Sequence, residues 1–246
     1  MAPACCVPPD GMSSAFCGDM QAMLAVEAID VHGHFGQLTA KPFASTPDSY
    51  IGYSAGPREE FVDEWSSATA ETVVQRAKAC NIGITCVSPL KGLFPMGMYP
   101  DGVDAVEANK EADVAVTALP ELLQWAVVNP RQPETFEQAA QLLKNERCCG
   151  LKIHPECHCW RLEEFGNQIF QFARDNGALV MCHSGHANSH PMDYVPFADA
   201  SPSINVILAH LGNSGNIEGP TDPTHHIRAI AASKHKNIYG TYVLSA

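Results

Sequence analysis

Short apolar runs alternate along this chain with longer segments whose apolar residues recur every three to four positions. This alternation is typical of β-strands that are each followed by a helix, and such units build a parallel sheet. The runs that predict strands are residues 28–35, 82–87, 124–129, 149–154, 179–183, 204–210 and 237–243. We therefore expect seven parallel strands after residue 27.

The segments between these runs predict helices that cover the sheet. In residues 135–144, Phe136, Ala139 and Leu143 share one helical stripe, and the same period begins at Leu162 and recurs after Pro223. Helices are also expected at residues 69–80 and 103–116. The length and apolar content suit one α/β domain at residues 28–246, preceded by an irregular leader at residues 1–27.

The composition narrows the class of partner. The formal net charge is -12, with 15 Lys and Arg against 27 Asp and Glu, whereas nucleic acids and anionic membranes attract clustered positive charge. We therefore expect a small-molecule substrate and neither nucleic acid nor membrane as a partner, and a homo-oligomer is left open. No run reaches the roughly 20 apolar residues of a membrane span. Ten Cys in a chain of this size favour reduced thiols and a cytoplasmic protein.

Two histidines lie on the first predicted strand, in the sequence Asp30-Val31-His32-Gly33-His34. Residues two apart on a strand point to the same face, so both imidazoles can share one metal ion. Asp30 lies on that face one step deeper and suits an acceptor that orients an imidazole. A His-x-His pair by itself is weak evidence for a metal.

Single histidines recur where later strands end. His154, His183 and His210 each follow an apolar run, and Pro or Gly comes within two residues, where the chain must turn. Four predicted strands thus bring histidine to one rim of the sheet. The competing interpretation is a set of independent structural histidines, and the joint pattern disfavours it.

Four segments occur in a recognisable order: Ile-Asp-Val-His-Gly-His, Gly-Leu-Lys-Ile-His-Pro, His-Ser-Gly and Leu-Ala-His-Leu-Gly. Together they resemble the amidohydrolase-related family of metal-dependent enzymes, over residues 28–246. The resemblance implies a (β/α)8 barrel of the TIM type. It also implies one divalent metal ion, most often Zn with Mn or Fe as alternatives, bound by His32, His34 and His183. His210 would stand beside it as a polarising or proton-transferring group.

The same resemblance assigns substrate contacts to the fourth strand. Lys152 and His154 share a face of that strand, where the family places substrate-side or second-metal groups. His154 could bind a substrate carboxylate or contact the metal, and Lys152, one layer deeper, could be a charge partner of the substrate. We favour one metal. Two long connections, residues 36–68 and 90–102, are expected to wall the pocket, because the loops after barrel strands build the active-site face. Arg58 and Lys91 lie in them and could pair with an acidic substrate.

The sequence departs from the family at its C-terminal end. Family members carry an Asp at the end of the eighth strand, whereas this chain stops at Ala246, just after the seventh predicted strand. We therefore expect a barrel that is incomplete at the C-terminus, with unpaired edges on the first and seventh strands. A fragment and a divergent paralogue both fit this pattern, and weak or absent catalysis is expected of the 246-residue chain.

Other polar residues are interpreted as structural. The cysteines between residues 148 and 159 lack the spacing of two Cys-x-x-Cys pairs, which disfavours a zinc knot. Ser184 lacks the Gly-x-Ser-x-Gly frame of a nucleophile. His225 and His226 open a predicted helix and are expected to be structural or to cap it.

Three functions remain open. The first is a metal-dependent hydrolase that uses a metal-activated water on a small amide, lactone or ester. The second is a non-oxidative decarboxylase or hydratase of a small carboxylic acid. The third is an inactive, truncated paralogue or fragment. The sequence does not decide between the first two.

Overall fold

A single parallel sheet organises the molecule. The computed structural model describes residues 28–36, 68–93, 103–185, 188–212 and 223–241. Within them the sheet has seven strands in the order β1-β2-β3-β4-β5-β6-β7, and each neighbouring pair is parallel. The strands are β1 (Ala28–Phe35), β2 (Ile82–Pro89), β3 (Leu122–Val127), β4 (Cys148–Ile153), β5 (Val180–Cys182), β6 (Val206–Leu208) and β7 (Ile238–Gly240). The predicted seven-stranded parallel sheet is confirmed.

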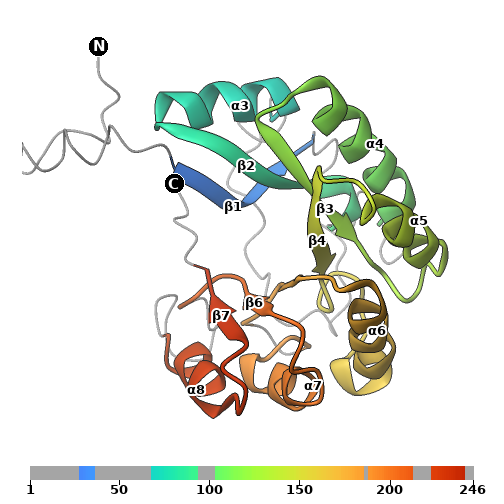
Figure 1. Cartoon of the computed structure of the whole chain (residues 1–246), viewed down its shortest axis with the longest axis vertical. Coiled ribbons are helices and arrows are strands. Elements are labelled where there is room, and N and C mark those ends of the chain that lie inside the picture. Colours follow the sequence, from blue (N-terminus) through green and yellow to red (C-terminus); the bar gives the residue numbers. More distant parts are fainter. Residues whose placement is uncertain (1–27, 37–67, 94–102, 186–187, 213–222, 242–246) are drawn as a thin grey trace, which may run out of the picture.

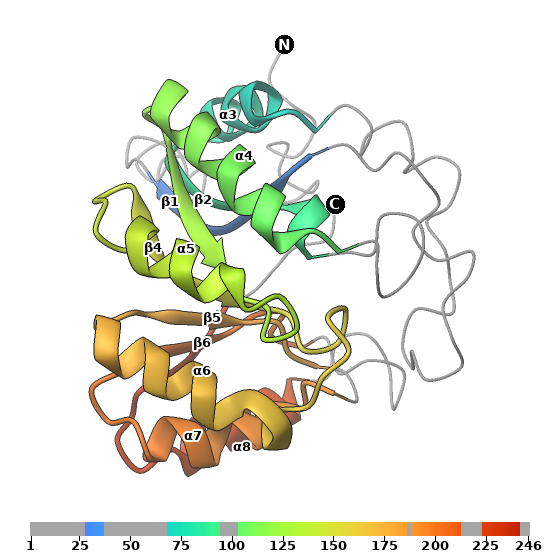
Figure 2. The same ribbon diagram turned by 90° about the vertical axis from the view of Figure 1, so that its right-hand side faces the viewer.

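The sheet curls into a half-barrel with helices on its outer side (Figure 1), and the turned view shows the same arrangement (Figure 2). The helices are α3 (Ala70–Ala79), α4 (Ala105–Ala118), α5 (Glu134–Leu142), α6 (Leu162–Asn176), α7 (Val195–Asp199) and α8 (Thr224–Ala232). Two 3-10 turns, η2 (Leu90–Gly92) and η3 (Pro191–Tyr194), complete the described elements. The α/β fold of an incomplete (β/α) barrel is therefore confirmed. Among the described strands, β1 and β7 are the two edges of the sheet.

The helices begin and end where local chemistry stabilises their termini. The Thr69 hydroxyl accepts a hydrogen bond from the Thr72 amide at the start of α3, and the Asp104 carboxylate does the same for the Glu107 amide at the start of α4. Gly177 ends α6 in the left-handed region, with φ of 61°, which a glycine adopts without steric cost.

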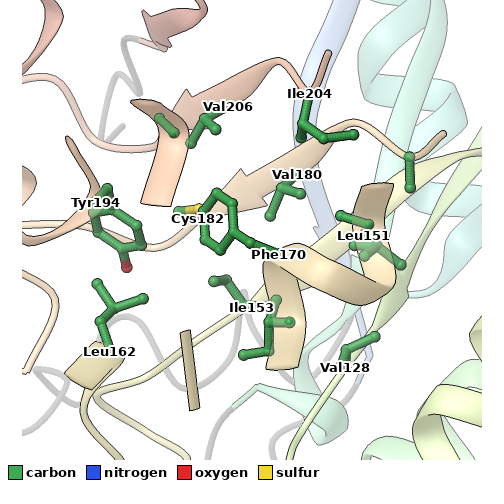
Figure 3. Close-up of a cluster of buried hydrophobic side chains, with 14 of the residues drawn as sticks. Val128, Leu151, Ile153, Leu162, Phe170, Val180, Cys182, Tyr194, Ile204 and Val206 are labelled. Atoms are coloured by element: carbon green, nitrogen blue, oxygen red, sulfur yellow. The ribbon is translucent and has the colours of Figure 1, made fainter. Parts of the chain in front are cut away.

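Alternate residues of each strand face the helices or the interior of the curved sheet. Leu151 and Ile153 of β4 pack with Phe170 of α6 in the main hydrophobic core (Figure 3). Lys152, between them, consequently points to the opposite face. A second cluster of Cys86, Trp125, Met181 and Ala209 fills the interior face, and the Trp125 indole donates a hydrogen bond to the Val31 carbonyl at 3.0 Å.

Several predictions differ from the structure or lie outside the described residues. The strands β5, β6 and β7 are shorter than predicted, and α7 and the two 3-10 turns were not predicted at all. The proposed leader, Arg58, and most of both long connections lie outside the described residues. No helix within the described ranges is long and apolar enough to cross a membrane.

Candidate functional site

Five histidines gather at the carboxyl ends of the strands. His32 and His34 lie in β1, whereas His154, His183 and His210 follow the last residues of β4, β5 and β6. The ring centroids of His32 lie 4.9 Å from those of both His34 and His210, and His183 lies 4.7 Å from His210. The His154 and His183 rings stack with centroids 3.8 Å apart. Residues up to 178 positions apart in the sequence thus form one cluster, counting from His32 to His210.

Three of the five histidines are shielded from water. His154 and His183 are each 2% exposed and His32 is 9% exposed, whereas His34 and His210 are half-buried. Lys152, which contacts His32, is 1% exposed. Burial lowers the pKa of His34 to about 4 and that of Lys152 to about 7, and it also lowers the pKa of His32. His32 and His34 are therefore neutral at pH 7, which is the form of imidazole that binds a metal ion.

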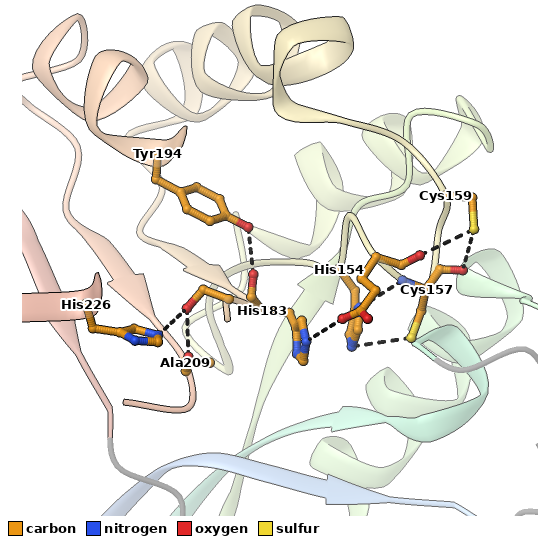
Figure 4. Close-up of polar contacts among 9 residues, drawn as sticks. His154, Cys157, Cys159, His183, Tyr194, Ala209 and His226 are labelled. Atoms are coloured by element: carbon orange, nitrogen blue, oxygen red, sulfur yellow. Dashed lines mark hydrogen bonds and ion pairs between the residues drawn. The ribbon is translucent and has the colours of Figure 1, made fainter. Parts of the chain in front are cut away.

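Hydrogen bonds fix which ring nitrogen of two histidines carries the proton. His34 Nδ1 lies 3.1 Å from both the carbonyl oxygen and the hydroxyl of Ser88. Because the carbonyl can only accept, Nδ1 donates to it and Nε2 keeps its lone pair. In His154 the proton is on the other ring nitrogen. Its Nδ1 accepts a hydrogen bond from the Cys157 amide at 3.2 Å, so the neutral ring carries its proton on Nε2 (Figure 4). His34 therefore keeps a lone pair on Nε2 that can bind a metal ion, whereas His154 Nε2 carries a proton and lies 3.6 Å from the Cys157 sulfur.

The donor set fits a metal ion in its chemistry but not in its present side-chain arrangement. Within the described parts of the chain, no three His, Cys, Asp or Glu side chains surround one point closely enough to hold an ion. His32 Nε2 faces Lys152 Nζ at 2.9 Å, and His183 Nε2 faces a Glu156 carboxyl oxygen at 3.1 Å. To bind an ion through Nε2, both rings would have to exchange these protein partners for it.

The sequence interpretation missed one acidic residue in this cluster. Glu156 is 3% exposed, and burial raises the pKa of its carboxyl to about 8. It lies in the turn after β4, where the two-residue period of a strand no longer indicates to which face a side chain points. The spacing His154-Pro155-Glu156 was the available signal, because it places a carboxyl directly after a strand that ends in histidine.

The prediction for Asp30 is wrong. Its carboxylate accepts a hydrogen bond from the His32 backbone amide at 2.9 Å and does not orient that imidazole, since His32 Nδ1 has no hydrogen-bond partner among the described residues. The orienting contact on this strand is instead the one between His34 and Ser88. The sheet is irregular here, because the register of β1 against β2 shifts between Asp30 and Gly33.

His210 has an unusual backbone conformation. Its φ is 65°, in the left-handed region that residues other than glycine rarely adopt. Such strain persists only where surrounding contacts impose it, and it occurs preferentially at functional sites. The turn at His210 leads the chain out of β6 and leaves its ring against His32 and His183.

A curved parallel sheet with polar residues gathered at the carboxyl ends of its strands defines a protein of the (β/α)-barrel class, whose sites lie at this edge. A family model described as amidohydrolase matches residues 29–242. Because the match spans most of the chain, the protein belongs to the amidohydrolase family. This membership supports a hydrolase activity or a related activity of that superfamily, whose members commonly bind a divalent metal.

Comparisons with individual proteins add little. No curated protein sequence matches the chain. A solved structure titled "Crystal Structure of SacUVDE" is 12% identical with a TM-score of 0.36, and the alignment covers 90% of this chain and 82% of that one. At this level of similarity the comparison carries no argument about function.

Proposed function

We propose that the protein is a metal-dependent hydrolase that acts on a small amide, lactone or ester. The observation that supports this most is the gathering of imidazoles from β1, β5 and β6 at one edge of the sheet. Three histidines with neighbouring polar groups are a typical protein ligand set for a catalytic divalent ion, with zinc the most common. His32, His34 and His183 would hold the ion.

Each residue of the cluster has a distinct part in this proposal. A divalent ion, when bound, supplies Lewis acidity and activates water at neutral pH. His210 lies against both His32 and His183, so its ring is placed to receive a proton from water and to pass it to the leaving group. His154 donates from Nε2 to a substrate oxygen, and Lys152 supplies a buried amine for the same purpose.

Metal analysis tests the ligand assignment. We expect about one equivalent of divalent metal in the purified protein, and loss of that metal in His32→Ala, His34→Ala and His183→Ala. His235→Ala is the matched control, because His235 is an exposed histidine between α8 and β7. Retention of metal by all three ligand variants would contradict the assignment.

Replacement of His210 tests the proton-transfer role. His210→Asn is expected to keep its metal while kcat on a panel of amides, lactones and esters falls by about 10²-fold or more, the usual contribution of a general acid or base. If the metal-loaded chain turns over none of these substrates, the hydrolase proposal fails and the inactive paralogue becomes the better description.

Decarboxylation of a small carboxylic acid is a second candidate function. It is favoured by Lys152 and His154, since both can donate to a carboxylate and both are buried in the cluster. Carbon dioxide release from a panel of aromatic and aliphatic carboxylic acids distinguishes this function from hydrolysis.

A further inference from the structure

A set of buried hydrogen bonds lies directly behind the candidate site. Ser184 follows His183, and its hydroxyl donates to the carbonyl oxygen of Ala209 at 2.7 Å. Ala209 in turn precedes His210. One side chain therefore joins the end of β5 to the end of β6, immediately beside the two histidines that those strands deliver (Figure 4).

His226 of the outer helix α8 contacts the same Ser184 hydroxyl. It is the third residue of α8, and its Nε2 lies 3.0 Å from Ser184 Oγ. Because the Ser184 proton goes to Ala209, the hydroxyl oxygen accepts and the His226 ring donates. Ser184, Ala209 and His226 are all 0% exposed, so water cannot replace any partner that is lost.

Tyr194 makes a separate hydrogen bond to the backbone of His183. Its hydroxyl, at the end of η3, donates to the His183 carbonyl oxygen at 2.6 Å, and the ring is fully buried. The backbone of His183 is thus fixed at its own carbonyl and through the next side chain. The strained φ of 65° at His210 persists only where surrounding contacts impose it. The hydrogen bond from the Ser184 hydroxyl to the Ala209 carbonyl is such a contact, because Ala209 directly precedes His210.

We propose that Ser184, His226 and Tyr194 form a brace that positions His183 and His210. These three are positioning residues that act through the two histidines. The inference rests on the proposed function only in the roles of His183 and His210, whereas the brace itself is a feature of the protein without metal. A brace with a merely stabilising role would affect unfolding and leave the geometry of the site unchanged.

Imidazole NMR of the metal-free protein tests this positioning directly. In Ser184→Ala and His226→Leu, we expect the ring 15N and 1H resonances of His183 and His210 to shift while those of the exposed His235 stay in place. His226→Gln should restore the wild-type resonances, because the Gln amide nitrogen occupies nearly the position of His Nε2 and also donates. Tyr194→Phe is a milder variant and should shift His183.

Metal affinity provides a second readout. Competition with a chelator should show Zn²⁺ binding about tenfold weaker in Ser184→Ala and His226→Leu, as is usual when groups that orient ligands are lost. Ser233→Ala is the matched control. Its hydroxyl is also buried, donating to Asn237 Oδ1 at 2.9 Å, but it lies between α8 and β7, so its loss should change neither readout.

The outcomes separate the brace from the proposed function. Unchanged His183 and His210 resonances and unchanged Zn²⁺ affinity in folded Ser184→Ala and His226→Leu would overturn the brace. If the wild-type protein binds no Zn²⁺, the proposed function fails, and the NMR comparison alone then decides the brace: shifted resonances restored by His226→Gln support it, and unshifted ones overturn it.

Discussion

At the scale of the residue, the neighbours of each ring decide what a clustered histidine can do. His34 has its Nδ1 proton committed to the Ser88 carbonyl, whereas His154 has its Nδ1 lone pair committed to the Cys157 amide. The same ring atom therefore behaves differently in the two residues: Nε2 of His34 has a free lone pair, whereas Nε2 of His154 carries the proton. Only His34 can ligate through that atom while keeping its present hydrogen bond.

This difference predicts opposite effects of two alanine substitutions. His34→Ala should lose bound metal, whereas His154→Ala should keep it and raise KM for an acidic or carbonyl substrate about tenfold or more, since a buried donor is lost. Metal content and steady-state kinetics measured on the same preparations check this. Loss of metal in His154→Ala would contradict the tautomer assigned to that ring.

A second prediction concerns pH and His158. This ring donates from Nε2 to the Gly92 carbonyl at 2.8 Å, and burial lowers the pKa of His158 to about 4, against about 6.5 in an unfolded chain. Between pH 6.5 and pH 4, His158 is protonated in the unfolded state but stays neutral in the folded state. The free energy of unfolding therefore falls as the pH drops from 6.5 towards 4. The loss due to this one residue is about 2 kcal/mol at pH 5.

Urea unfolding at pH 7.5 and pH 5 measures that contribution. His158→Gln retains a donor to Gly92 and cannot titrate, so its free energy of unfolding should decrease between the two pH values by about 2 kcal/mol less than that of the wild type. The same decrease in both proteins would show that His158 does not contribute.

At the scale of the element, β1 lies so close to β2 that glycine is the residue that fits at position 33, between His32 and His34. A Cβ atom on Gly33 would lie 2.4 Å from Thr85 Cγ2 and 3.2 Å from Val87 Cγ1. Any larger residue would therefore push β1 away from β2 and move His32 and His34 with it.

Gly33→Ala is thus expected to destabilise the fold by about 1–3 kcal/mol, the usual cost of overpacking. Thr85→Ser removes the clashing methyl group, so the double variant Gly33→Ala with Thr85→Ser should recover most of the loss. Chemical denaturation of the two single variants and the double variant measures this coupling. Additive effects would contradict the assigned contact.

The strands were predictable from the sequence, and their polar contacts were not. Segments such as residues 149–154 predict a strand because they are short, apolar and bounded by turn residues. The direction of Lys152 follows from the two-residue period, but its contact with His32, 120 positions away, depends on how the sheet curls. Glu156 and Ser184 lie just after the ends of β4 and β5, where neither period applies, and the partner of His226 becomes apparent only once α8 packs against η3 and β7. The roles assigned to the site residues stay predictions.

At the scale of the whole molecule, the described sheet is open between β1 and β7, and the candidate ligands come from strands that are not neighbours in it. His32 and His34 belong to the edge strand β1, whereas His183 follows β5. An ion bound to all three would link the edge strand β1 to β5, four strands along the sheet. Metal binding should therefore stabilise the global fold as well as the site.

Thermal unfolding with and without Zn²⁺ tests this coupling. At a free Zn²⁺ concentration of about 100 times Kd, the expected gain is about 2.7 kcal/mol, or a rise in Tm of roughly 5–10 °C for a chain of this size. His32→Ala should show no such rise, with His235→Ala behaving as wild type. A rise that survives in His32→Ala would place the ion elsewhere.

Anomalous diffraction at the zinc absorption edge, from crystals grown with Zn²⁺, would locate the metal directly. One peak is expected at the carboxyl ends of the strands, about 2.0–2.1 Å from a ring nitrogen of each of His32, His34 and His183. A peak bound elsewhere, or rings that keep their contacts with Lys152 and Glu156 while Zn²⁺ is present, would contradict this metal site.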